Sequence, residues 1–240
     1  KNRMSGVPSA NSTVQSSTIA VTTIAAVLAC VVAVASSLYL SSSAPASTTA
    51  FLSRLSRRLS PSSPCRMSGF APRSRGVSGA ARLHFYDECV GSTQSVAREL
   101  LAGGEAPPFA VHAKSQGVGK GTNDRTWYSP EGNLYLTVVA PASQVMAGKF
   151  PLGLVPLKVG AVVRESIAAV MGPSASVRLK WPNDVLIEGK KVSGVLIEMD
   201  SGNFLIGVGC NVGVAPEVPK SGKEMGRESG RLLDWMGGEE

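Results

Sequence analysis

Short apolar runs separated by polar turns fill the chain from residue 83 onward. Most of these runs are four to eight residues long and rich in Val, Ile and Leu, which is typical of β-strands. Two longer stretches instead repeat their apolar residues with helical spacing. We expect strands at residues 83–89, 109–114, 133–139, 177–181, 184–187, 192–199 and 204–210, and helices at 94–101 and 152–170.

Turn residues mark where these elements begin and end. Gly91-Ser92-Thr93 can cap the first helix, because a side-chain hydroxyl accepts from the free N–H groups of a first helical turn. Gly103-Gly104 stops the same helix, and Glu188-Gly189-Lys190-Lys191 joins two strands in a hairpin. Strands outnumber helices and hairpins dominate, so the expected fold class is α+β, with a mostly antiparallel, mixed sheet packed against helices.

Residues 1–82 differ in composition from the rest, and we interpret them as a targeting leader. Ile19 to Leu40 is apolar and uncharged, long enough for a membrane span or a secretory signal. The segment after it is rich in Ser, Arg and Pro and lacks acidic residues, which is typical of transit peptides and of disorder. The whole resembles a two-part plastid-targeting leader. The alternatives are a membrane anchor at 19–40 and a cytoplasmic product that starts at Met67.

The net charge divides near the same boundary. Residues 1–86 hold nine Lys or Arg and no acidic residue, whereas residues 87–240 hold fifteen basic and seventeen acidic residues. The formal charge of +7 therefore lies in the leader, and the part that folds is slightly acidic. We expect no nucleic-acid binding, although a basic protein would suggest it.

Cysteine and histidine spacing indicates neither a disulfide framework nor a zinc site. Cys89 and Cys210 are far apart in the sequence, and no Cys-x-x-Cys pair occurs. His84 and His112 have no clustered partners. We expect both of these cysteines to be small buried apolar residues, and no metal site in the protein itself.

The first candidate site is Lys180-Trp181-Pro182-Asn183-Asp184, which interrupts an apolar run. A lysine held among strands is costly to bury without an anionic partner, so this lysine indicates an anion site on rigid scaffold. Asn183 and Asp184 are expected to brace the turn after Lys180. Lys191 in the following hairpin is either a solvated charge or part of the site.

The second candidate site is the loop from Gln116 to Trp127. Three glycines within five residues let the backbone approach a ligand and expose N–H groups to an anion. Lys120 and Arg125 add positive charge, and Trp127 can cover a planar or apolar group. The glycine spacing fits neither a Walker phosphate loop nor a dinucleotide-binding fingerprint.

Both stretches resemble motifs of the biotin protein ligases. The Lys-Trp-Pro-Asn-Asp run and the Lys-x-x-Gly hairpin after it match the family's signature. Gly119, Gly121, Arg125 and Trp127 keep the frame of its biotin- and adenylate-binding loop.

Two further motifs resemble the same family. Gly91-Ser92-Thr93-Gln94 is similar to its Asp-Ser-Thr-Asn, and Gly207-Val208-Gly209-Cys210-Asn211 is similar to its closing Gly-x-Gly-x-Asn strand. The motifs occur in the family's order. The resemblance implies a catalytic domain at residues 83–215 with the class II synthetase-like fold of biotin and lipoate ligases, followed by a short polar tail at 216–240, either minimal or truncated. No helix-turn-helix precedes the domain, so we expect no repressor function.

The resemblance implies a two-step, ATP-dependent ligase reaction. Biotin and ATP form biotinyl-5′-AMP with Mg²⁺ present, and a lysine of a biotin carboxyl carrier domain, such as that of acetyl-CoA carboxylase, then takes the biotin. Such an enzyme must hold two anions together and stabilise charge at the α-phosphate. Homodimer formation is left open. A lipoate or octanoate ligase of the same fold and an inactive biotin-binding protein are the alternatives.

The residues that the resemblance assigns to this reaction fall into three overlapping groups. The catalytic group is Lys180, Lys120 and Arg125. The biotin-binding group is Ser92, Thr93, Gln116, Gly119, Lys120, Lys180, Gly194, Gly207 and Gly209. The ATP- and adenylate-binding group is Thr122, Arg125, Trp127, Lys180 and Asn211.

The loop departs from the bacterial pattern at three places. Lys120 and Thr122 each stand where bacteria have Arg, and Asn123-Asp124 replaces an Arg-Gly pair. Lysine keeps the charge but loses the bidentate fork of arginine. We therefore expect weaker retention of biotinyl-AMP than in a bacterial ligase.

Overall fold

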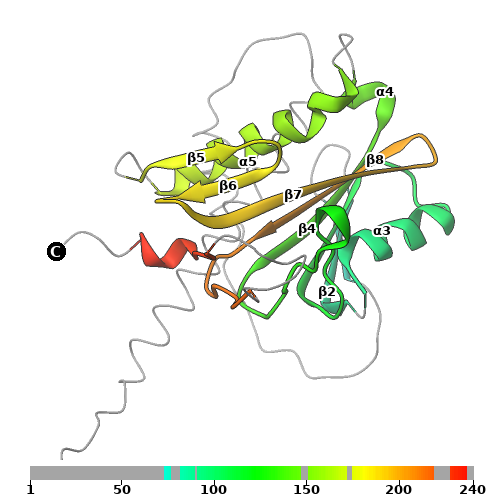
Figure 1. Ribbon diagram of the computed structural model, residues 1–240. Coiled ribbons are helices and arrows are strands. Elements are labelled where there is room, and N and C mark those ends of the chain that lie inside the picture. The colour runs from blue at the N-terminus through cyan, green and yellow to red at the C-terminus, as the bar shows by residue number, and fades with distance from the viewer. Residues whose placement is uncertain are drawn as a thin grey trace, which may run out of the picture.

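The computed structural model describes residues 73–76, 82–89, 91–146, 151–171, 175–218 and 228–236. These residues build one eight-stranded sheet in the order β1-β2-β3-β4-β8-β7-β6-β5 (Figure 1). Within it β2 and β3 pair in parallel, and the other neighbours are antiparallel. The expected α+β class with a mixed, mostly antiparallel sheet is confirmed. The strands are β1 (Arg73–Gly76), β2 (Arg82–Cys89), β3 (Phe109–Gln116), β4 (Leu134–Pro141), β5 (Val177–Lys180), β6 (Asp184–Ile187), β7 (Lys190–Asp200) and β8 (Asn203–Cys210).

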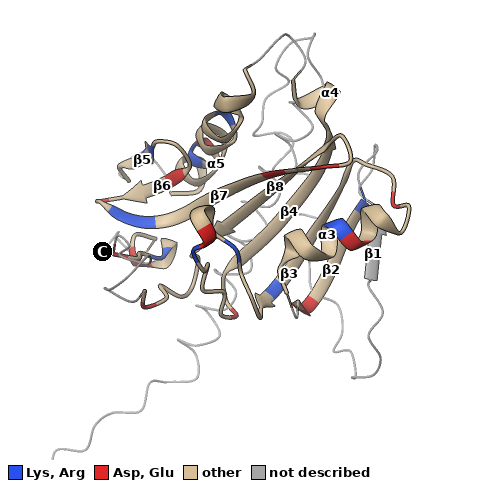
Figure 2. Ribbon diagram, turned by 45° about the vertical axis from the view of Figure 1, so that its right-hand side comes forward, with Lys and Arg blue, Asp and Glu red and all other residues tan. Residues whose placement is uncertain are grey.

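Two helices cover opposite faces of this sheet (Figure 2). α3 (Thr93–Ala102) joins the parallel pair, since parallel neighbours need a crossover. As expected, the Ser92 side chain accepts from the backbone N–H of Ser95 at its start, and Gly103 caps its end. α5 (Val155–Met171) packs against β5, β6 and β7. The remaining helical turns are η1 (Thr122–Asp124), α4 (Ala142–Val145), η2 (Leu152–Leu154) and η4 (Leu232–Asp234).

Alternation of side chains along β4 and β8 separates two cores. Leu136 belongs to the larger core with α5, and Val139 and Leu205 belong to the smaller core with α3. On the same α3 face, two residues away from Val139 and Leu205, the aliphatic side chains stop: β4 has Thr137 and β8 has Gly207. The apolar core under α3 thus gives way to a sheet surface of small and polar residues.

The expected elements are present, with ends within three residues of the structure. The helix expected at 152–170 begins with the separate turn η2, and Pro156 sits in the first turn of α5, where its missing N–H costs nothing. Cys89 and Cys210 are buried, as expected, and both are free thiols in the structure. Desolvation raises the pKa of the Cys89 thiol to about 11 and that of Cys210 to about 12, so both stay protonated.

Two described segments outside residues 83–215 also take part in the fold. β1 lies within the stretch interpreted as leader and pairs with β2. Ser229 bridges to Lys191 of β7, and Leu232 is fully buried in the larger core. The apolar stretch 19–40 and Met67 lie outside the described residues. Among the helices that are described, none has the length and hydropathy to cross a membrane.

Candidate functional site

A pocket opens on the α3 face, where β4, β7 and β8 continue beyond the small core. Strand backbone forms its floor: Gly207 lies between Thr137 and Leu196, and Gly209 lies two residues further on, beside Gly194. The start of α3, the loop from Gln116 to Tyr128, the turn after Lys180, and Ser229 form its walls. The described elements of both sequence motifs therefore converge on one cavity.

The end of the pocket beside α3 is uncharged and rich in hydrogen-bonding groups. Gln116 Oε1 accepts from the Thr93 backbone N–H at 2.8 Å and from the Thr93 hydroxyl at 3.2 Å. The hydroxyls of Thr93 and Thr137 are 2.8 Å apart, and both residues are buried. This end suits a neutral polar group that both donates and accepts hydrogen bonds.

The glycine loop is held against the same end by a relay of hydrogen bonds. Gln116 Nε2 donates to Ser129 Oγ at 2.8 Å, and Ser129 Oγ donates to the Trp127 carbonyl at 2.9 Å. The Trp127 N–H in turn donates to the Gly119 carbonyl at 2.9 Å. A Cβ at position 119 would lie 2.1 Å from the Trp127 carbonyl oxygen, so only glycine fits there.

The η1 turn explains the departures at 122–124. The Arg125 guanidinium folds back onto Thr122, donating from Nε to its carbonyl at 3.0 Å and to its hydroxyl at 2.7 Å. Asn123 and Asp124 have φ of 58° and 57°, a region that Asn, Asp and Gly tolerate best. Asn123 and Asp124 can therefore form this turn without a glycine.

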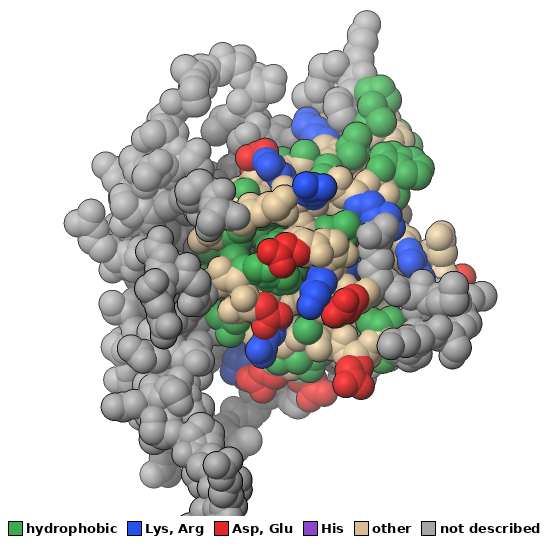
Figure 3. Space-filling view, turned by 60° about the vertical axis from the view of Figure 1, so that its left-hand side comes forward, with side chains coloured by type: hydrophobic (Ala, Val, Ile, Leu, Met, Phe, Trp, Pro, Cys, Tyr) green, Lys and Arg blue, Asp and Glu red, His purple; other side chains and the backbone are tan. Residues whose placement is uncertain are grey.

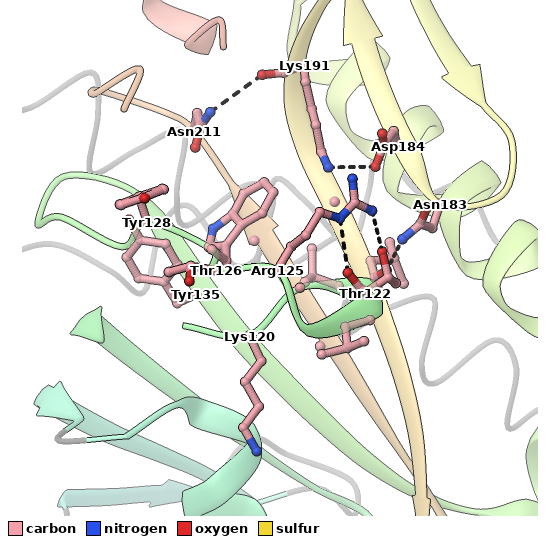
Figure 4. Close-up of a pocket in the computed structure, with 18 of the residues that line it drawn as sticks. Lys120, Thr122, Arg125, Thr126, Tyr128, Tyr135, Asn183, Asp184, Lys191 and Asn211 are labelled. Atoms are coloured by element: carbon pink, nitrogen blue, oxygen red, sulfur yellow. Dashed lines mark hydrogen bonds and ion pairs between the residues drawn. The ribbon is translucent and has the colours of Figure 1, made fainter. Parts of the chain in front are cut away.

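The opposite end of the pocket is cationic. Lys191 Nζ lies 2.7 Å from Asp184 Oδ1 and 5.1 Å from the Trp127 ring centroid, which combines an ion pair with a cation–π contact. Figure 4 shows Lys191 and Asp184 pointing toward each other beside Arg125, while Lys120 points away from them.

Basic residues outnumber acidic ones in the lining of the pocket, but not on the outer surface. Lys120, Arg125, Lys180 and Lys191 line the pocket, against the single carboxylate of Asp184. On the face in Figure 3, basic and acidic side chains instead lie interleaved. A pocket lined by four cations and one carboxylate forms a site for a polyanion.

Trp127 lies directly on the glycine floor. A Cβ at Gly209 would be 2.5 Å from its Cε2 and Nε1, and a Cβ at Gly194 would be 3.0 Å from its Cζ3. The floor therefore needs glycine for the indole ring to lie flat on the sheet.

Asn211 ties the pocket to the described C-terminal segment. Its side-chain Nδ2 donates to the Gly230 carbonyl at 3.1 Å, and its backbone carbonyl accepts from the Leu232 N–H at 2.9 Å. The Lys191 N–H donates to the Glu228 carbonyl at 2.9 Å. Residues 228–232 thereby hold Asn211 and Lys191 in place and bring Ser229 into the wall.

Most residues assigned from the sequence meet in this pocket. Thr93, Gln116, Lys120, Thr122, Arg125, Trp127, Lys180, Gly194, Gly207, Gly209 and Asn211 all line it. Ser92 and Gly119 do not: Ser92 caps α3, and Gly119 shapes the loop from behind.

Two features of the site differ from the sequence argument. Lys180 is exposed at the wall, so it is the partly buried Lys191 that has the anionic partner expected for a strand lysine. Asn183 braces its turn as expected, donating to the Val195 carbonyl at 2.7 Å, but Asp184 serves Lys191 instead. Position in the Lys-x-x-Gly hairpin was the signal that could have selected Lys191.

The model of the biotin/lipoate A/B protein ligase family matches residues 86–215, more than half of the chain. The chain belongs to this family.

Two curated relatives of the chain are biotin ligases. The chain is 34% identical over 134 residues to the bifunctional ligase/repressor BirA of Escherichia coli, covering 52% of this chain and 40% of that protein. It is 29% identical over 132 residues to the biotin–[acetyl-CoA-carboxylase] ligase of Paracoccus denitrificans, covering 53% of each. The chain spans about half the length of the curated relatives it matches.

Two solved structures extend the likeness to the fold. The biotin protein ligase of Leishmania major, in complex with biotinyl-5-AMP, is 35% identical with a TM-score of 0.55, over 63% of each chain. The biotin protein ligase of Aquifex aeolicus, in complex with biotin and ATP, is 32% identical with a TM-score of 0.52. That match covers 65% of this chain and 61% of the other.

Proposed function

We propose that this protein is a biotin–protein ligase. It activates biotin with ATP to biotinyl-5′-AMP, with release of pyrophosphate. It then transfers biotin to a lysine of a biotin carboxyl carrier domain, such as that of acetyl-CoA carboxylase, with release of AMP. The observation that carries the proposal is the two-ended pocket, with a neutral hydrogen-bonding end at Thr93 and Gln116 and a cationic end at Lys180 and Lys191. Biotin has a neutral ureido ring at one end and a carboxylate at the other, and ATP adds phosphates beside that carboxylate.

In this scheme the protein acts by holding two anions against their mutual repulsion. Thr93 and Gln116 bind the ureido ring, and Lys180 stands near the carboxylate and the α-phosphate, where negative charge grows as the anhydride forms. Arg125 and Lys191 supply further positive charge, and Trp127 covers the planar adenylate. The reaction needs no covalent intermediate on the protein.

Mg²⁺ fits this scheme as a companion of ATP rather than as a resident metal. The described residues contain no group of three His, Cys, Asp or Glu that could hold a metal ion. The pocket's carboxylate, Asp184, is already ion-paired with Lys191. A Mg²⁺ ion bound through the triphosphate and water, as this ion prefers, would screen the phosphate charge.

Biotin transfer with a matched pair of variants tests the proposal. The 240-residue chain is mixed with biotin, ATP, Mg²⁺ and a purified carboxyl carrier domain, and labelled streptavidin detects the product. Lys180→Ala should lower the rate by about a hundredfold or more, as loss of a transition-state charge contact does. Arg178→Ala, an exposed cation on the same strand but outside the pocket, should leave it unchanged.

Each other outcome has a distinct meaning. Biotinyl-AMP without labelled carrier would restrict the activity to the first step. Absence of both products from the wild-type chain would refute the proposal.

A further inference from the structure

Gln94 is a buried polar residue of the pocket that the roles above do not use. It is the second residue of α3, only 3% exposed, and lines the neutral end. Its Nε2 donates to Glu198 Oε2 of β7 at 2.8 Å. Its Oε1 has no hydrogen-bond partner among the described residues.

The contact with Glu198 fixes which way this amide points. A carboxylate only accepts hydrogen bonds, so it must face the NH₂ group of Gln94 and not its oxygen. Arg98 holds Glu198 in place through a 2.7 Å ion pair, and lies 3.7 Å from Asp200. The carbonyl oxygen of Gln94 is therefore held facing away from Glu198.

Gln94 lies against the glycine floor of the pocket. This position places its carbonyl oxygen beside the hydrogen-bonding residues of the neutral end. A Cβ at Gly207 would lie 3.3 Å from Gln94 Cδ, so the amide rests on the backbone at Gly207. Gly207 pairs with Thr137, whose hydroxyl contacts Thr93. A buried acceptor without a donor is costly, and a ligand N–H would remove that cost.

We propose that Gln94 determines specificity: its Oε1 accepts a hydrogen bond from an N–H group of the ligand's head. The pocket then prefers a cyclic urea to a head group without N–H, such as the dithiolane of lipoate. Glu198 is a positioning residue that acts through Gln94. This inference rests on the proposed function, since it takes biotin as the ligand.

Calorimetric titration of the full chain with biotin, with lipoate as competitor, tests the inference. Gln94→Met keeps the length of the side chain but removes the acceptor, and should weaken biotin binding about tenfold to a hundredfold while lipoate affinity stays the same. Glu198→Gln should weaken biotin binding by less, because an amide can face Gln94 either way round. In the double variant the two effects should not add, since orientation no longer matters once the acceptor is gone.

Glu99→Gln is the matched control for Glu198→Gln. It removes a carboxylate from the exposed side of α3, outside the pocket, and should leave biotin affinity unchanged. Thermal unfolding of each variant checks that it folds. If Gln94→Met does not fold, Glu198→Gln decides: wild-type biotin affinity in that variant overturns the inference.

Failure of this inference is distinguishable from failure of the proposed function. If the wild-type chain binds no biotin, both are overturned. If it binds biotin and Gln94→Met binds equally well, only the role of Gln94 is overturned. A parallel loss of biotin and lipoate affinity in Gln94→Met would show that Gln94 merely shapes the pocket, which also overturns the inference.

Discussion

At the residue scale, the contact between Trp127 and Gly209 gives a direct test of how the loop meets the sheet. β8 is fixed between β4 and β7, whereas Trp127 lies on a loop, so a new methyl group displaces the ring and not the strand. Gly209→Ala should cost about 1 to 3 kcal/mol of ring–sheet contact, the usual range for overpacking. We expect red-shifted tryptophan emission and weaker adenylate binding.

Two variants control this measurement. Gly153→Ala places a methyl group where no atom of the described residues lies within 4 Å, and should change neither emission nor binding. In a Trp127→Phe background the red shift on Gly209→Ala should disappear. Unchanged emission from Gly209→Ala itself would contradict the described ring position.

At the scale of elements, the segment with Glu228 and Leu232 behaves as part of the domain. Leu232 is fully buried, so Leu232→Ala should lower the free energy of unfolding by about 2 to 5 kcal/mol in urea denaturation. Hydrogen exchange at the Lys191 N–H, which donates to Glu228, should speed up in the same variant. Leu233→Ala, at a half-buried position, should cost less, and equal losses from the two would argue against this packing.

Elements with clear apolar patterning were the ones predictable from sequence. The strands that end at Cys89 and Cys210 have such a pattern. β1 has the sequence Arg-Ser-Arg-Gly, without one apolar residue, and so cannot be recognised as a strand from its pattern. The segment at Ser229 is polar as well. Its place follows from long-range backbone pairing with β7, which a local pattern does not encode.

The candidate site was predictable where a motif fixes its residues, and less so where geometry decides. The glycines and Trp127 were identified from the sequence, because a backbone that another group approaches closely requires glycine, and the glycines form a recognisable motif. The sequence did not reveal that Lys191, and not Lys180, has the anionic partner. That pairing depends on a register shift at Val185/Leu186, which sets how β6 pairs with β7. Gln94 and Glu198, 104 positions apart, meet only through tertiary structure.

At the scale of the whole molecule, burial of His112 makes stability depend on pH. Desolvation, with a contribution from Lys114, lowers the pKa of His112 to about 4 from its ordinary 6.5. The unfolded chain therefore takes up this proton first as pH falls, so stability present above pH 6.5 is lost between about 6.5 and 4. The full loss is roughly 3 kcal/mol, at 1.36 kcal/mol per pKa unit.

His112→Leu separates this effect from that of the carboxylates. Neither ring nitrogen of His112 has a hydrogen-bond partner among the described residues, so leucine removes no polar contact there. Urea denaturation at pH 7.5 and pH 5 should show a smaller drop in stability for the variant than for the wild-type chain. Equal drops would mean that His112 is protonated in the folded protein at pH 5.

The glycine floor at Gly194, Gly207 and Gly209 also limits how this pocket can be engineered or can drift. Glycine is the smallest residue, so every substitution at these positions adds atoms and makes the cavity shallower. A variant of the proposed ligase that accepts bulkier biotin analogues therefore requires smaller side chains in the walls, at Gln94, Gln116 or Trp127. No substitution at the floor can make the cavity deeper, so only substitutions in the walls can enlarge it.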